Sequence, residues 1–139
     1  MTFNLAPYPK VLLALCVWRE ARNVPSAYGA VAWVILNRAT ARTQQPLDDA
    51  VVAVIAAPWQ FSSMTEPGDP NLIKWPLVGW ASWLAVQDEV EGVLTGETPD
   101  LTQDATFYFS APITEPPDEW GDVGKTLQIG TLQFFRRVG

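Results

Sequence analysis

The sequence predicts a mainly helical α+β fold, in which several helices precede a short β-hairpin formed by the C-terminal part of the chain. Three observations support this fold class. Four segments repeat apolar residues at spacings of three and four, one later run is rich in β-branched and aromatic residues, and the 139 residues are 48% apolar. A chain of this length buries one core, so we expect one domain over residues 1–139.

The first two predicted helices occupy residues 9–23 and 27–38. In the first, Leu15 and Trp18 fall on one face, and Pro9 occupies the first turn, where its missing N–H is not needed. The second helix is apolar nearly all round, which is typical of a helix at the centre of a core. We expect these two helices to form the middle of the domain.

Two more helices are predicted on either side of a long loop. Residues 47–57 begin with two aspartates in the first turn, the end of a helix that favours negative charge. Residues 59–76 contain three prolines, with a fourth at Pro58 just before them, and predict a shaped loop, a type of segment that often binds ligands. Residues 78–94 predict the last helix, with Gly96 as its C-cap.

The β-structure is predicted near the C-terminus. Residues 105–109 (ATFYF) combine β-branched and aromatic side chains over the length of a short strand. Apolar and polar residues alternate over residues 127–135, which supplies a partner strand. The two segments together predict the hairpin.

Composition excludes several classes of function. The 9 basic and 15 acidic residues give a net charge of −6, so few positive charges can neutralise phosphates, and we expect no nucleic-acid partner. The chain contains no histidine, which excludes Ser-His-Asp and Cys-His nucleophile pairs and histidine-based metal sites. We expect neither a metal nor a cofactor, and we expect Cys16, set in an apolar run, to be a buried core residue.

No segment predicts export or membrane insertion. The apolar run at residues 11–18 is far shorter than the roughly 20 residues that span a bilayer. It also lacks the small-residue cleavage site of a secretory signal. We expect a monomer that is synthesised in the cytoplasm without a signal peptide and does not insert into a membrane.

Acid–base chemistry must therefore come from carboxylates, and Glu20 is the carboxylate whose surroundings differ. The other acidic residues lie on amphipathic helices or in polar loops, whereas Glu20 follows one strongly apolar helix and precedes another. Partial desolvation raises the pKa of a carboxyl group, which suits a general acid. The alternative is a structural ion pair between Glu20 and Arg19, Arg22 or Arg38.

Several short motifs follow one another along the chain in a defined order. They are CVWREARN at residues 16–23, YGAVA at 28–32, VILNR at 34–38, VAVI at 52–55, QFS at 60–62, ATFYF at 105–109, Trp120, IG at 129–130 and FF at 134–135. This ordered set resembles the SleB-type cell wall hydrolases and covers most of the chain. The resemblance implies a compact lysozyme-like helical domain that cleaves the glycan strands of peptidoglycan, as spore-cortex lytic enzymes and phage lysins do.

The resemblance also implies roles for individual residues. It assigns the catalytic role to Glu20. The residues that match the family motifs and that we expect to line the groove are Gln60, Ser62, Thr106 and Tyr108.

Three positions depart from the family pattern. Arg19 replaces a common glycine, Phe107 replaces a histidine, and Leu132 ends a Gly-Thr-Leu block where the family has Gly-Asn-His. Since the chemistry of the family is attributed to the glutamate, we interpret these departures as changes in the groove lining or in the residues that support it.

The seven tryptophans fall into two groups. Sugar-binding grooves place aromatic rings against the apolar faces of pyranose rings, so the loop tryptophans are candidates for saccharide contact together with Tyr108. These candidates are Trp59, Trp75 and Trp120. The tryptophans on apolar helix faces are expected in the core, and they are Trp18, Trp33, Trp80 and Trp83.

A single carboxyl group suffices for a lytic transglycosylase, because the 6-hydroxyl of muramic acid attacks the anomeric carbon and closes a 1,6-anhydro ring. Glu20 would act first as acid and then as base. We expect cleavage between N-acetylmuramic acid and N-acetylglucosamine by a phage endolysin that reaches the wall with a holin-like partner. The alternatives are a hydrolytic muramidase, which uses another carboxylate or a held water, and a non-catalytic wall-binding or virion structural protein on the same scaffold.

Overall fold

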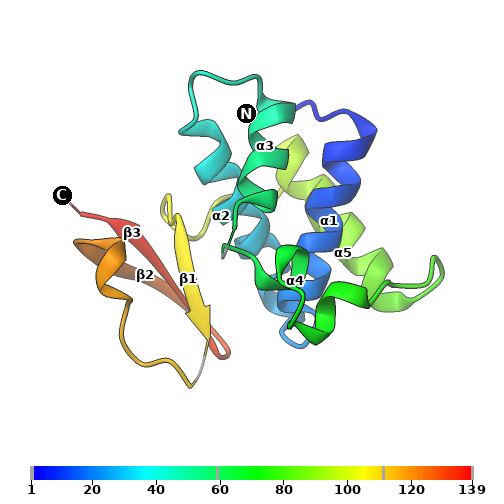
Figure 1. Cartoon of the computed structure of the whole chain (residues 1–139). Helices are drawn as coiled ribbons and strands as arrows, with labels where there is room; N and C mark the ends of the chain where they lie inside the picture. The colour runs from blue at the N-terminus through cyan, green and yellow to red at the C-terminus, as the bar shows by residue number, and fades with distance from the viewer. Residues whose placement is uncertain (1, 59, 111, 139) are drawn as a thin grey trace.

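The computed structural model describes residues 2–58, 60–110 and 112–138, in which a group of helices packs beside a small antiparallel sheet (Figure 1). The helices are α1 (Pro7–Ala21), α2 (Tyr28–Thr40), α3 (Leu47–Ala56), α4 (Ser62–Thr65) and α5 (Ala81–Thr95), with the 3-10 turns η1 (Pro25–Ala27), η2 (Pro70–Ile73) and η3 (Asp118–Trp120). The strands are β1 (Phe107–Ser110), β2 (Val123–Ile129) and β3 (Leu132–Arg137). The predicted α+β class is confirmed.

Helix α2 lies at the centre of the helical layer, as its apolar sequence predicts. It packs against α1, α3 and α5, and its Val31 and Ile35 side chains are fully buried. Helix α1 adds Trp18 and Cys16 to the same core, and Cys16 is buried as predicted. Burial of this apolar surface is the main favourable term in folding. It therefore fixes the two helices whose last turns carry Glu20 and Arg38.

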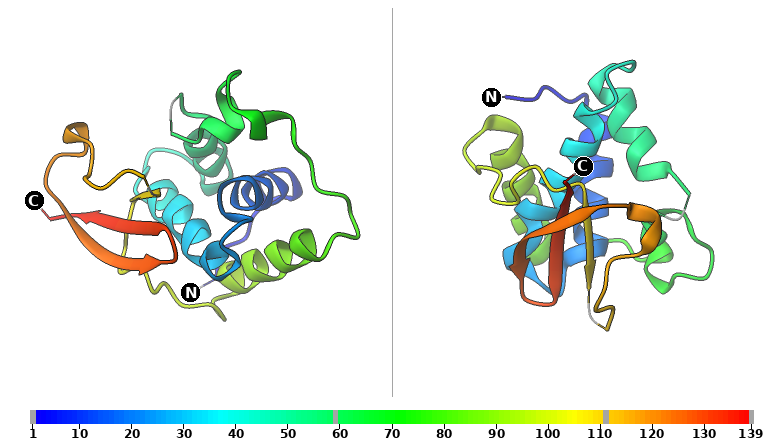
Figure 2. Two further views of the ribbon diagram at one scale, coloured as in Figure 1. Left: turned by 90° about the horizontal axis from the view of Figure 1, so that it is seen from below. Right: turned by 90° about the vertical axis from the view of Figure 1, so that its left-hand side faces the viewer.

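The sheet has three strands rather than the two of the predicted hairpin. Its order is β1-β3-β2, and both pairs are antiparallel. The segment predicted as one strand over residues 127–135 is divided by a turn at Gly130, whose φ of +56° is a left-handed conformation that glycine adopts at little cost. The view in Figure 2 (left) shows the sheet standing at one side of the helices.

The helix boundaries differ from the prediction by a few residues. The last helix begins at Ala81 rather than at residue 78, since Trp80 has an extended backbone and is the N-cap, while Gly96 is the left-handed C-cap that the sequence predicts. The predicted loop over residues 59–76 contains α4 and η2, two turns too short to have a periodic signature. In the described part of the chain, no helix combines the length and apolar character needed to cross a membrane.

The tryptophans on helix faces are only partly core residues. Trp18 and Trp83 are buried as predicted, and Trp33 is half-buried with its Nε1 donating a hydrogen bond to the carbonyl oxygen of Thr98 at 3.0 Å. Trp80 is 46% exposed, so its prediction as a core residue is wrong. The cause is the later start of α5, which leaves Trp80 outside the helix.

Candidate active site

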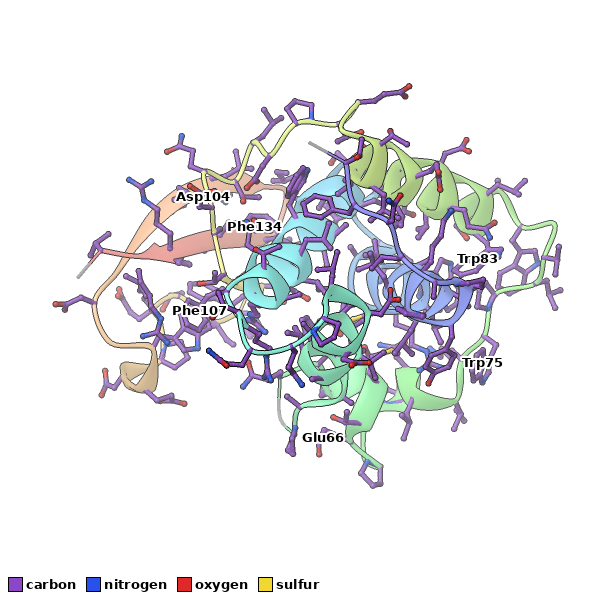
Figure 3. The ribbon with its side chains drawn as sticks, turned by 90° about the horizontal axis from the view of Figure 1, so that it is seen from above. Glu66, Trp75, Trp83, Asp104, Phe107 and Phe134 are labelled. Carbon is purple, nitrogen blue, oxygen red and sulfur yellow. The ribbon has the colours of Figure 1, made fainter. Side chains whose placement is uncertain are left out.

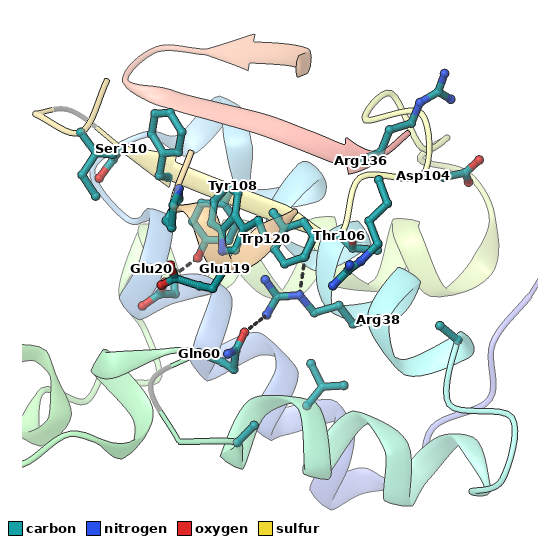
Figure 4. Close-up of a pocket in the computed structure, with 18 of the residues that line it drawn as sticks. Glu20, Arg38, Gln60, Asp104, Thr106, Tyr108, Ser110, Glu119, Trp120 and Arg136 are labelled. Carbon is teal, nitrogen blue, oxygen red and sulfur yellow. Dashed lines mark hydrogen bonds between the residues drawn. The ribbon is translucent and has the colours of Figure 1, made fainter. Parts of the chain in front are cut away.

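A cleft of about 1390 Å³ lies between the helices and the sheet, and residues from several elements line it (Figure 4). Helix α1 contributes Glu20 from its last turn, and α2 contributes Arg38 from its last turn. Four more lining residues are ones that the sequence predicts for the groove, and they are Gln60, Ser62, Thr106 and Tyr108. Segments distant in sequence thus meet at one surface.

Two hydroxyl groups hold the Glu20 carboxylate. The Tyr108 hydroxyl donates a hydrogen bond to Oε1 at 2.5 Å, and the Ser63 hydroxyl donates to Oε2 at 2.6 Å. Among the described residues, no arginine lies within 4.0 Å of this carboxylate, so the alternative of an ion pair with Arg19, Arg22 or Arg38 is wrong. Because each carboxylate oxygen has a second lone pair, either can still take or give a proton at the cleft.

The surroundings of Glu20 favour its protonated form. Burial is the main cause and raises the pKa of Glu20, and the charge of Asp69 raises it further. The hydrogen bonds from Ser63 and Tyr108 and the more distant charge of Arg38 lower this pKa, but burial prevails. A carboxyl group with a raised pKa is a competent general acid at a pH where an ordinary glutamate is fully ionised.

Arg19 fixes the position of Ser63. Its guanidinium is buried, donates from Nη1 to the carbonyl oxygen of Ser63 at 3.2 Å and from Nε to that of Lys74 at 3.0 Å, and lies 4.8 Å from the centre of the Trp75 ring. Arg19 thus ties α4 and the segment after η2 to α1, and so it holds the hydroxyl that Glu20 accepts from.

The sequence predicts Ser62 as a groove residue, but the serine that contacts Glu20 is Ser63. The Ser62 hydroxyl donates to Oδ2 of Asp69 at 2.6 Å, while Ser63 is buried and points its hydroxyl to Glu20. Both residues lie in the single turn of α4, which the sequence does not reveal, so their directions were not predictable. The adjacent pair of serines was the available signal.

Arg38 connects the two walls of the cleft. Its Nη1 donates to Oε1 of Gln60 at 3.2 Å, its Nε donates to the carbonyl oxygen of Thr106, and its guanidinium lies 5.5 Å from the centre of the Phe107 ring. Figure 4 shows this arginine between Gln60 and Thr106. Two predicted groove residues are therefore positioned by a third residue whose role the sequence did not assign.

The three loop tryptophans have different outcomes. Trp120 lines the cleft and stacks on Phe107 with ring centres 4.6 Å apart. Trp75 is 66% exposed, does not line the cleft, and lies on the opposite side of the molecule from Phe107 in Figure 3. The Trp75 ring packs instead on the Arg19 guanidinium, outside the cleft lining, so its contact with substrate stays a prediction. Trp59 lies outside the described residues.

Other carboxylates surround Glu20 at greater distance. Asp69 accepts hydrogen bonds from the Ser62 hydroxyl and from the backbone N–H of Asn71 at 2.8 Å. Asp104 and Glu119 line the cleft and are exposed. Within the described ranges, no three His, Cys, Asp or Glu side chains gather in a way that would hold a metal ion.

Two comparisons place this fold and site among known proteins. The chain is similar to the catalytic domain of the Bacillus cereus SleB protein, with 26% sequence identity, a TM-score of 0.67, and coverage of 96% of this chain and 93% of that one. No curated protein matches the chain significantly. The family described as cell wall hydrolase matches residues 26–135. This chain therefore belongs to the cell wall hydrolase family.

Proposed function

We propose that the chain cleaves the glycan strands of peptidoglycan between N-acetylmuramic acid and N-acetylglucosamine, with Glu20 as the catalytic acid and base. The observation that carries this proposal is the placement of Glu20, which lines the cleft, has a raised pKa and is held by two hydroxyl donors. Glu20 precedes the segment matched by the family, so its assignment rests on this geometry. The volume of about 1390 Å³ exceeds that of most small-molecule pockets and suits an oligosaccharide.

In the first step, the protonated Glu20 gives its proton to the glycosidic oxygen, and the bond between that oxygen and the anomeric carbon of N-acetylmuramic acid breaks. The N-acetylglucosamine side leaves with a free hydroxyl as positive charge develops at the anomeric carbon. Negative charge then builds on the Glu20 oxygens, where the hydroxyls of Ser63 and Tyr108 already point. Donors that are in place before the charge appears stabilise the transition state without further reorganisation.

In the second step, the ionised Glu20 accepts the proton of the muramic 6-hydroxyl as that oxygen attacks the anomeric carbon. A 1,6-anhydro ring forms and Glu20 returns to its protonated state. This lytic transglycosylase route needs one carboxyl group, which fits a glutamate whose nearest hydrogen-bond donors are hydroxyls.

Hydrolysis is the second candidate reaction, and the position of Glu119 in the same cleft favours testing it. A hydrolytic muramidase uses a second carboxylate as nucleophile or to activate water. Glu119→Gln would then lose most of its activity, whereas a transglycosylase would retain cleavage after this substitution.

The test digests purified sacculi with the wild type and with Glu20→Gln and identifies the products by mass spectrometry. We expect 1,6-anhydromuramic ends from the wild type and none from the variant. Undiminished cleavage by Glu20→Gln would refute the role of Glu20. Reducing ends in place of anhydro ends would keep Glu20 as the acid but assign the enzyme to the hydrolases.

The biological setting that we propose is that of a phage endolysin, made in the cytoplasm and released to the wall by a holin-like partner. Expression of the chain in a bacterial host, alone and with a pore-forming partner, tests this setting. Lysis only in the presence of the partner would support it. Binding to sacculi with no released muropeptide would instead support the non-catalytic alternative.

A further inference from the structure

The cleft is locally basic although the chain is acidic. Four of the nine basic residues of the chain line it, against three of the fifteen acidic residues. The four are Arg38, Arg42, Arg136 and Arg137, and the three are Glu20, Asp104 and Glu119. Arg38 and Arg42 come from the end of α2 and the residues just after it, while Arg136 and Arg137 end β3. The fold thus brings together at one cleft four of the chain's nine basic residues, from two elements distant in the sequence.

In the part of the chain that the structure describes, no acid neutralises these guanidinium groups. Among the described residues, none of the four lies within 4.0 Å of a carboxylate, and the ion pair that the structure shows, Lys10 with Glu91, lies outside the cleft. Arg42 donates to Oε1 of Gln45 at 3.5 Å, an uncharged partner. Guanidinium groups that share a cleft without a described carboxylate partner repel one another, so an anion that enters the cleft relieves an unfavourable interaction.

Phe107 brings two of these charges together. The guanidinium carbons of Arg38 and Arg137 lie 5.5 Å and 5.1 Å from the centre of the same ring. An aromatic ring attracts cations weakly and orients their planes, while leaving the N–H groups at the edges open to other partners.

The arginine cluster is displaced from the reacting carboxyl along the cleft. In Figure 4, Glu20 and Tyr108 lie at one end, Arg136 and Asp104 at the other, and Arg38 between them. A ligand of these arginines would therefore be a substituent of the glycan rather than the bond that Glu20 protonates. The N-acetylated glycan backbone is uncharged, and its carboxylates hang from the lactyl ether of each muramic acid.

We propose that Arg38, Arg42, Arg136 and Arg137 form a subsite for the carboxylates carried on the muramic lactyl group, which are those of the stem peptide or, on strands without stems, the lactyl carboxylate itself. The inference rests on the proposed function. A guanidinium fork matches a carboxylate with two parallel hydrogen bonds. Since only every second sugar carries this group, the subsite would set which of the two alternating linkages lies at Glu20.

Binding measured without cleavage tests the subsite. Isothermal titration calorimetry measures the affinity of the Glu20→Gln variant for three kinds of glycan fragment. The first kind carries stem peptides, and the second is the same fragment with its carboxylates converted to neutral amides. The third is stripped of its stems, so that only the lactyl carboxylate remains. Arg136→Gln/Arg137→Gln and Arg42→Gln remove charge from two separate elements. Lys125→Gln, on β2 and outside the cleft, is the matched control for charge.

We expect the conversion of the ligand carboxylates to amides, and each arginine substitution, to weaken binding about tenfold or more. Because both changes remove the same interaction, an arginine variant should bind the amide ligand no more weakly than either change alone predicts. The control should bind like its parent. A tenfold loss on stripping identifies the stem carboxylates as the ligand, whereas retained affinity that still depends on the arginines identifies the lactyl carboxylate. Equal affinity for all three ligands would overturn the subsite and leave the proposed function intact, while no binding of any fragment would overturn the proposed function itself.

Discussion

The hydroxyl of Tyr108 offers the sharpest test of how Glu20 works. Tyr108→Phe removes the donor to Oε1 and keeps the ring, whose centre lies 5.7 Å from that of Phe134. An O–H donor at 2.5 Å from a carboxylate is in the range of charge-assisted hydrogen bonds, which contribute about 1.5–3 kcal/mol. We expect kcat to fall about 10- to 100-fold, because the charge that develops on Glu20 loses this stabilisation.

Tyr108→Phe should also shift the pH profile of kcat/KM to higher pH. The Tyr108 hydrogen bond lowers the pKa of Glu20, so its removal raises this pKa. As the catalytic acid, Glu20 must be protonated, and activity is lost as the pH rises through its pKa. The alkaline limb of kcat/KM should therefore move to higher pH even as kcat falls.

Steady-state kinetics across pH on soluble glycan fragments provides the measurement. Tyr28→Phe is the matched control, since the Tyr28 hydroxyl lies 3.5 Å from the carbonyl oxygen of Arg22 and does not contact Glu20. A Tyr108→Phe enzyme that loses activity with an unmoved limb, or with a limb at lower pH, would refute this account and leave Tyr108 a packing role.

Three further predictions concern stability and substrate affinity. Burial raises the pKa of Glu20 in the folded state, so the contribution of Glu20 to stability is complete below its pKa in the unfolded chain and is lost as pH rises through its pKa in the folded protein. Glu20→Gln should therefore raise Tm at neutral pH and leave it unchanged near pH 3. Arg19→Met leaves the buried carbonyl of Ser63 unpaired and should lower the free energy of unfolding by about 1–3 kcal/mol in a denaturant titration, with a fall in kcat that Arg19→Lys partly reverses. Trp120→Ala should raise KM about two- to tenfold, whereas Trp75→Ala should leave KM unchanged, and equal effects of the two would contradict the placement of the groove.

The fold was largely predictable because it depends on periodicity. The apolar residues on nearly every face of α2 predict a central helix, and Gly96 predicts the end of α5. What periodicity does not encode was missed. The turn at Gly130 divides one alternating segment into two strands, and α4 is a single turn inside a proline-rich loop.

The site was predictable only in part, for a related reason. Glu20 stood out because two apolar helices flank it, and burial is a property that local sequence reports. Its partner Ser63 depends on the direction of one turn and on a buried arginine from another helix, which are tertiary facts. The arginine cluster was equally hidden, because its members are spread between residues 38 and 137.

The absence of histidine now has a positive use in the assignment of the acid. Among the described residues, the hydroxyls of Ser63 and Tyr108 donate hydrogen bonds to Glu20, and Arg38 acts on it through its charge. Burial raises the pKa of Tyr108 well above its ordinary value, and guanidinium groups stay charged throughout the accessible range. No imidazole titrates in the chain. An inflection of kcat/KM that moves on Tyr108→Phe is therefore assigned to Glu20. The exposed carboxylates Asp104 and Glu119, which also line the cleft, have no hydrogen bond to Tyr108 that this substitution would remove.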